Sequence, residues 1–144
     1  MRILSNFVLL TGICAMVTAC GAPDRVSADR KLDKACQAAV QALLTGNDVI
    51  EVESTNFTDE TAPDGATLRV VEAQAYVSYD GGGYEDQPYK CAFFENTGKF
   101  RMGYSAKVEY IEFEGEVYGK QDGVIEGTFE DNLKITEAVN SVLR

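Results

Sequence analysis

A run of strict alternation over residues 100–110 constrains the fold more than any other part of this 144-residue chain. Glycine and polar residues occupy its odd positions, and its even positions are Phe100, Met102, Tyr104, Ala106, Val108 and Tyr110. Successive side chains of a β-strand point to opposite faces, so this period of two predicts a strand with one face buried and the other in water. The chain is therefore expected to contain a sheet that is covered on one face only.

Further strand candidates precede this run. Residues 49–57 are rich in β-branched side chains, residues 69–79 carry apolar side chains at most odd positions, and residues 89–95 form a short apolar segment. Polar residues with Pro and Gly over 58–67 predict a loop, and the Asp-Gly-Gly-Gly sequence of residues 80–83 predicts a turn. These segments predict consecutive antiparallel strands.

The remaining turns complete a meander. Residues 96–99, Asn-Thr-Gly-Lys, predict a hairpin turn. The alternation changes phase between Tyr110 and Ile111, which indicates a bulge or bend. The apolar pairs at 117–118 and 124–125 flank a glycine-containing turn and predict a last hairpin.

Two amphipathic segments predict helices at the ends of the domain. The first is expected to start with Ser27 as its N-cap and to stop at Gly46. Its apolar stripe is Leu32, Ala35, Cys36, Ala39 and Leu43. In the second, Thr128 and Asp131 resemble a capping box. Its predicted apolar stripe is Phe129, Leu133, Thr136, Val139, Val142 and Leu143, and Ile135 widens this apolar face.

The order of these elements predicts an α+β fold. It has an N-terminal helix, an antiparallel meander of about five strands and a C-terminal helix, with the helices packed on one face of the sheet. The competing interpretation ends the chain with a β-strand in place of the second helix.

The first twenty residues have the pattern of an export signal. Arg2 supplies positive charge, and the apolar run over residues 3–17 has the length of a signal-peptide core but is too short for a membrane-spanning helix with flanking anchors. The run ends in Val17-Thr18-Ala19-Cys20, which resembles the lipobox of bacterial lipoproteins. The resemblance implies a signal peptide over residues 1–19, with diacylglycerol on the sulfur of Cys20 and an acylated new amino terminus. The alternative is an ordinary secretory signal that leaves Cys20 as a thiol.

The lipoprotein interpretation assigns a role to each of the four cysteines. Residues 20–28 become a lipidated tether, and residues 29–144 become a single domain. Cys14 leaves with the signal and Cys20 carries lipid, so Cys36 and Cys91 remain as one pair. In an oxidising cell envelope this pair is expected to form a disulfide. Gly21, in place of aspartate, implies an outer-membrane anchor facing the periplasm if the cell is Gram-negative.

The charge balance and the missing histidine exclude several functional classes. The formal net charge of −10 disfavours nucleic acid, whose phosphates require basic surfaces. It also disfavours a domain that lies flat on anionic lipid headgroups. Without histidine, histidine-dependent catalytic triads and histidine-ligated zinc sites are excluded. We therefore assign no catalytic residue, metal or cofactor, and expect contact with the membrane through the lipid anchor.

Glu112, Glu114 and Glu116 form the one notable acidic stretch. In a regular strand they would line one face, and the resulting acidic surface would attract a basic protein partner. A carboxylate pair for glycoside cleavage is a second interpretation. The third is a solvated polar strand with a turn at Gly115.

Two further stretches carry candidate contacts. Residues 80–86, Asp-Gly-Gly-Gly-Tyr-Glu-Asp, offer oxygen ligands for calcium, but they lack EF-hand spacing and a hairpin loop is the preferred interpretation. Phe94 has the opposite parity to Cys91 and Phe93, so its side chain is predicted to point away from the core. It marks either a contact with a ligand or partner, or a side chain that covers backbone.

Two short motifs resemble known envelope proteins. Ala35-Cys36-Gln37-Ala38-Ala39 and Tyr89-Lys90-Cys91 are similar to motifs of small proteobacterial envelope proteins of unknown function, which implies no activity. Membrane-bound lysozyme inhibitors are similar in class, as acidic lipoproteins with disulfides. The sequence thus predicts a non-enzymatic envelope lipoprotein that binds a protein partner. The alternatives are an inhibitor of a basic envelope-targeting hydrolase such as lysozyme, and an enzyme that works through carboxylates alone.

Overall fold

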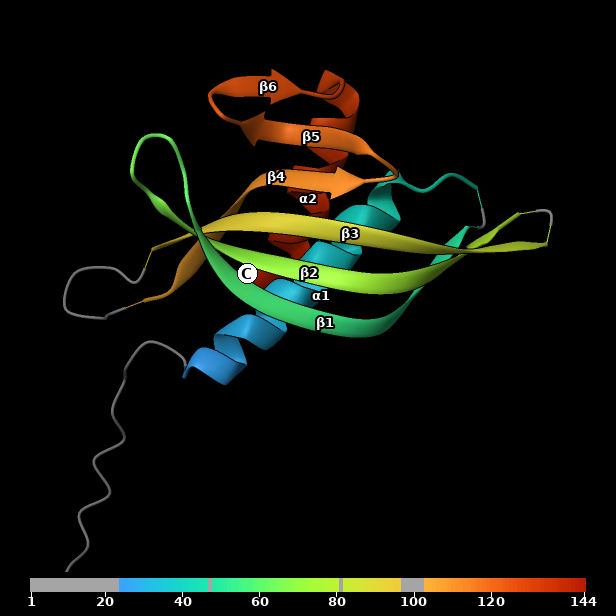
Figure 1. Cartoon of the computed structure of the whole chain (residues 1–144), viewed down its shortest axis with the longest axis horizontal. Helices are drawn as coiled ribbons and strands as arrows, with labels where there is room; N and C mark the ends of the chain where they lie inside the picture. The colour runs from blue at the N-terminus through green and yellow to red at the C-terminus, as the bar shows by residue number, and fades with distance from the viewer. Residues whose placement is uncertain (1–23, 47, 81, 97–102) are drawn as a thin grey trace, which may run out of the picture.

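The structure, a computed structural model, describes residues 24–46, 48–80, 82–96 and 103–144 (Figure 1). In chain order its elements are α1 (Arg25–Leu43), β1 (Val49–Thr61), β2 (Thr67–Tyr79), β3 (Gly83–Asn96), β4 (Ser105–Phe113), β5 (Glu116–Gln121), β6 (Val124–Glu126) and α2 (Phe129–Leu143). The strands form one antiparallel sheet in the order β1-β2-β3-β4-β5-β6. The predicted α+β class is confirmed, with one helix before the meander in the chain and one after it. The strand count is six rather than about five, and β5 and β6 are the two strands of the predicted last hairpin.

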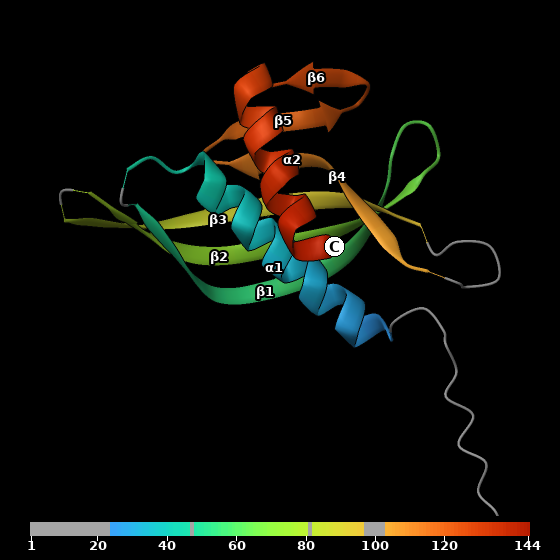
Figure 2. The same ribbon diagram turned by 180° about the vertical axis from the view of Figure 1, so that it is seen from behind.

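Both helices lie on the same face of the sheet (Figures 1 and 2). α1 contacts β1 to β4, while α2 packs mainly against α1 and reaches β4 and β5. Figure 1 looks onto the opposite face, which no helix covers. We call that side the helix-free face.

The core lies between the sheet and the helices. In β2 the odd positions from Val71 to Val77 are buried and the even positions from Glu72 to Tyr76 are exposed, as the period of two requires. The largest fully buried side chains of this layer are Leu32, Val40, Val71, Val77, Phe93, Ile111 and Val139. Each buried side chain of this size stabilises the fold by about 1.5–3 kcal/mol relative to an exposed position.

α1 begins one turn earlier than the sequence predicts. Its N-cap is Asp24, whose Oδ1 accepts a hydrogen bond of 2.9 Å from the backbone N–H of Ser27. The predicted N-cap Ser27 therefore lies inside the helix. Aspartate and serine both cap helices, so Asp24 and Ser27 were both possible first residues. Val26, which lies between them, is exposed, so no buried apolar side chain marked the start of the helix.

The second helix has its predicted cap. The hydroxyl of Thr128 accepts a hydrogen bond of 3.1 Å from the backbone N–H of Asp131, and it donates one of 2.6 Å to the Asp131 carboxylate. Its buried side chains, however, are Ile135 and Val139, while Phe129 and Leu133 are exposed. The predicted apolar stripe is therefore wrong at its start.

The phase change in β4 is a β-bulge. Ala92 pairs with Tyr110 and Phe93 pairs with Val108, so Glu109 has no partner in the register. Before the bulge, Val108 faces the helices; after it, Ile111 and Phe113 do, and Tyr110 turns to the helix-free face. The predicted bulge is confirmed, but it lies at Glu109, one residue before the predicted position. Residues 97–102, which include most of the predicted turn and the start of the predicted strand, lie outside the described residues.

β1 and β3 are longer than predicted. β1 continues to Thr61. Its end carries ion pairs rather than apolar side chains, so its sequence shows no strand pattern: Asp59 lies 2.9 Å from Arg69 and Glu60 lies 2.7 Å from Lys90. β3 begins at Gly83, so most of the predicted 80–86 loop is strand. Residues 83–86 are exposed on both faces, and a strand exposed on both faces shows no alternation of polarity.

Candidate functional site

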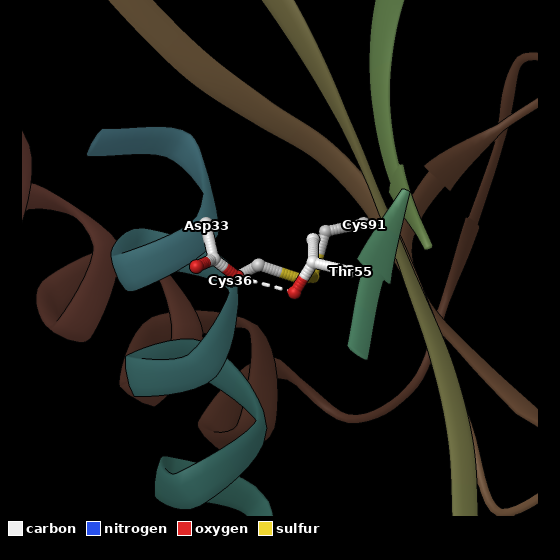
Figure 3. The surroundings of a disulfide bond; sticks show 4 residues. All are labelled: Asp33, Cys36, Thr55 and Cys91. Atoms are coloured by element: carbon white, nitrogen blue, oxygen red, sulfur yellow. Dashed lines mark hydrogen bonds between the residues drawn. A yellow bond between two sulfur atoms is a disulfide. The ribbon is translucent and has the colours of Figure 1, made fainter. Parts of the chain in front are cut away.

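A buried disulfide joins α1 to the centre of the sheet (Figure 3). Cys36 and Cys91 have Cα atoms 5.8 Å apart, and both residues are fully buried. Beside the bond, Thr55 of β1 donates a hydrogen bond of 3.2 Å to Asp33 of α1. The predicted pairing is confirmed, and its burial suits a structural link rather than an exchanging thiol. Cys14 and Cys20 lie outside the described residues.

The three glutamates predicted to share one strand face do not share it. Glu112 lies in β4, Glu116 begins β5, and Glu114 and Gly115 form the turn between them, with φ angles of 53° and 78°. A two-residue turn with positive φ at both positions reverses the chain. Glu116 pairs with Phe113, so Glu112 and Glu116 point to opposite faces of the sheet.

Each of these carboxylates has a separate partner. Glu112 accepts a hydrogen bond of 3.0 Å from Gln121, Glu114 accepts one from Tyr79, and Glu116 accepts one of 2.9 Å from Tyr118. Partial burial and then the neighbouring carboxylate raise the pKa of each of these two tyrosines to about 12. The glutamates therefore stabilise three different contacts and do not make one acidic surface.

A hydrogen-bonded charge network occupies the middle of the helix-free face. Lys90 Nζ lies 2.7 Å from Glu60 Oε1 and 3.9 Å from Glu112 Oε1, and it sits 5.4 Å from the centre of the Tyr110 ring. The Tyr110 hydroxyl donates a hydrogen bond of 2.8 Å to the other oxygen of Glu60. The hydrogen bond from Lys90 lowers the pKa of Glu60. Partial burial acts to lower the pKa of Lys90, but the bonds to Glu60 and Tyr110 outweigh it and raise that pKa.

Beneath this network lies a second, smaller apolar cluster that the sequence interpretation missed. Its buried members are Leu68, Val70, Ala92 and Tyr110, with Ala62 and Val117 packed beside them. Leu68 and Val70 occupy even positions of β2, whereas the side chains of the main core occupy odd positions. These two apolar residues on the even side were the sequence signal for a second cluster.

Two adjoining hollows lie on the helix-free face and share Lys90 in their linings. The first, of about 570 Å³, lies between the β1–β2 hairpin and the β5–β6 turn and is bordered by Phe94. The second, of about 630 Å³, is lined by Ser54, Asn56, Glu72, Gln74, Pro88 and Glu112, among others. Phe94 is 40% exposed and cross-strand from Leu68, which confirms that it points away from the core.

A separate apolar surface is exposed where β6 meets α2. Phe129 is 84% exposed, Ile125 is 74% exposed and Leu133 is 46% exposed. We call these three residues the β6–α2 patch. Ile125 and Phe129 border a groove of about 400 Å³ that also contacts Val108, Tyr118 and Ile135. Acidic residues surround the patch along the chain: Asp122, Glu126, Glu130 and Asp131.

A second charge network holds the start of α1 to the sheet. Arg25 lies 2.7 Å from Glu95, and Arg69 bridges Asp29 and Asp59 at 2.7 and 2.9 Å. Burial acts to raise the pKa of Asp29, but the hydrogen bonds from the two arginines outweigh it and lower that pKa. Every member is paired within the network, so it serves to fix the helix.

The described residues contain no cluster of three or more cysteine, aspartate and glutamate side chains able to hold a metal ion. Nor does any helix in the described part of the chain have the length and apolar character needed to cross a membrane.

Comparisons with protein-family models, with curated proteins and with solved structures found no match to this chain.

Proposed function

We propose that this protein is a non-enzymatic accessory lipoprotein of the cell envelope, anchored through Cys20, and that its β6–α2 patch binds a protein partner. The observation that carries the proposal is the exposure of Ile125, Phe129 and Leu133 together. Burying such a side chain in an interface removes apolar surface from water and is worth about 1.5–3 kcal/mol for each one. Exposed apolar groups with a polar rim are the usual anatomy of a protein-binding site.

The acidic surroundings of the patch indicate the character of the partner. Glu130 is paired with Lys134 at 2.9 Å, but Asp122 and Glu126 make no ion pair among the described residues. A partner with basic residues around an apolar centre would complement this rim and associate faster at low salt.

The position of the patch suits an anchored protein. α1 begins at one end of the molecule, and β6 and the start of α2 lie at the other end (Figure 1). A lipid on Cys20 would sit four residues before Asp24, so it would hold the first end near the membrane and leave the patch directed away from it.

Crosslinking in membranes followed by affinity capture tests the proposal. Wild type should recover a specific protein, and Phe129→Ser and Ile125→Ser should lose it. Tyr84→Ser, which removes an equally exposed ring elsewhere, is the matched control and should retain the partner. Equal recovery by wild type and both patch variants would refute a role for the patch, and the absence of any specific protein would refute the binding function.

Inhibition of a basic hydrolase such as lysozyme is the second candidate, favoured by the net charge of −10 and the acidic rim. Purified protein should then slow lysozyme at low salt, and the Phe129→Ser variant should slow it less. Unchanged lysozyme activity at low salt would reject this candidate for the enzyme tested.

A further inference from the structure

Three exposed aromatic rings lie along the helix-free face, outside the β6–α2 patch. Tyr84 is 76% exposed and Tyr76 is 44% exposed, and they are diagonal neighbours because Tyr84 pairs with Ser78 and Tyr76 with Asp86. Phe94 lies ten residues further along β3, which corresponds to about 33 Å of extended chain. The two hollows lie between these ends.

The surface between the rings offers hydrogen-bonding groups and carries more acidic than basic side chains. Ser54, Asn56 and Gln74 present hydroxyl and amide groups to the second hollow. Lys90 is paired with Glu60 and Lys107 with Glu109, each at 2.7 Å, whereas Glu72 makes no ion pair among the described residues. A ligand of this face therefore needs hydrogen-bonding groups and no negative charge.

The same surface is unsuited to other ligand classes. Leu68, Val70 and Ala92 are buried, and the large aliphatic side chains exposed on this face, Val49 and Val124, lie on the edge strands. It thus lacks the contiguous aliphatic surface that a lipid chain or an apolar protein segment requires. The carboxylates of Glu60, Glu72 and Glu112 would repel an anionic polymer.

We propose that the helix-free face binds a linear, uncharged polysaccharide. The C–H faces of sugar rings stack on aromatic rings, and their hydroxyl groups exchange hydrogen bonds with amide, hydroxyl and carboxylate groups. Tyr76, Tyr84 and Phe94 supply the stacking surfaces, and polar side chains of the two hollows between them supply hydrogen-bonding partners. Each hollow falls within the range of about 300–1,000 Å³ typical of ligand sites. This site is distinct from the proposed protein-binding patch and does not depend on it.

Calorimetric titration of the full-length protein, in a detergent without a sugar headgroup, tests this site. Two neutral oligomers, chitohexaose and cellohexaose, are compared with cationic glucosamine hexamer and anionic galacturonic acid hexamer. Binding of either neutral oligomer supports the proposal, and a preference between them reports whether the acetamido group is recognised. Binding of only a charged oligomer, or of none at millimolar concentration, overturns it.

Exposed-ring variants locate the binding surface. Tyr84→Ala and Phe94→Ala should each weaken binding of the neutral oligomer about three- to tenfold, the range expected for losing one ring contact. Phe129→Ala removes an exposed ring from the β6–α2 patch and should leave sugar binding unchanged, although it should lose the captured protein. Far-UV circular dichroism verifies that each variant is folded. Unchanged affinity in both ring variants would overturn the assignment of this face, whatever the outcome for the protein partner.

Discussion

Removing the Cys36–Cys91 disulfide should cause a large, calculable loss of stability. The bond closes a loop between residues 55 positions apart, and the entropy of that closure corresponds to about 4 kcal/mol in the free energy of unfolding. Alanine is the replacement of choice at both positions. Serine would bury a hydroxyl without a hydrogen-bond partner at two fully buried sites, which adds a separate cost.

Urea unfolding measures this loss directly. The chain has no tryptophan, so far-UV circular dichroism is the appropriate signal. With a urea dependence of about 2 kcal/mol per molar, the midpoint of the double variant should fall by about 2 M. Each single variant breaks the same bond, so each should lose nearly as much as the double variant, and the two single losses should sum to about twice the double loss.

The oxidised and reduced wild-type proteins provide the control, because reduced wild type should unfold close to the double variant. A double variant that stays within about 1 kcal/mol of oxidised wild type would refute the reasoning from loop closure. Additive losses in the two single variants would show that the side chains, and not the bond between them, carry the stability.

Four further changes have definite expected outcomes. Gly119→Ala should destabilise by well over 1 kcal/mol and clearly more than Gly115→Ala in urea unfolding, because both glycines have positive φ but only at Gly119 would a Cβ lie 2.4 Å from the Glu109 carbonyl oxygen. Tyr89→Phe should be neutral or stabilise by up to about 1 kcal/mol in the same assay, because the buried hydroxyl makes no hydrogen bond within the described part of the chain; a clear loss would contradict this. Lys90 holds the pKa of Glu60 below its ordinary 4.5, so ionised Glu60 stabilises the fold above that pH and this contribution is lost as the pH falls through the lower folded value. Glu60→Gln should therefore flatten the acid side of a plot of urea midpoint against pH, and an unchanged slope would count against the Lys90 pairing. Cys20→Ser should release the protein from the membrane fraction, and unchanged fractionation would reject the lipoprotein interpretation.

The parts of the fold that follow from sequence are those with one covered face. In β2, helices cover the odd side and water covers most of the even side. The alternation of Val71, Ala73, Ala75 and Val77 with polar residues therefore predicted both the strand and its buried face. Phe94 was placed correctly for the same reason, since its parity differs from that of Cys91 and Phe93.

The parts that sequence did not predict lack such a contrast. The start of β3 meets water on both faces, and the end of β1 is held by ion pairs to Arg69 of β2 and Lys90 of β3. The same limit applies to the candidate sites. Phe129 and Leu133 fit a buried stripe as well as Val139 does, and only the packing of α2 on α1 determines that Ile135 and Val139 are covered instead.

The order of strands in the sheet has a consequence for how the chain folds. Every strand pairs with its neighbour in the sequence, so each hairpin can form as soon as its second strand is available, with short loops to close. The helices differ, because α1 must wait for β3 before Cys36 can meet Cys91, and α2 needs α1 at the far end of the chain. A chain exported from its amino terminus would thus assemble its sheet progressively, join α1 to the sheet once β3 is present, and pack α2 last.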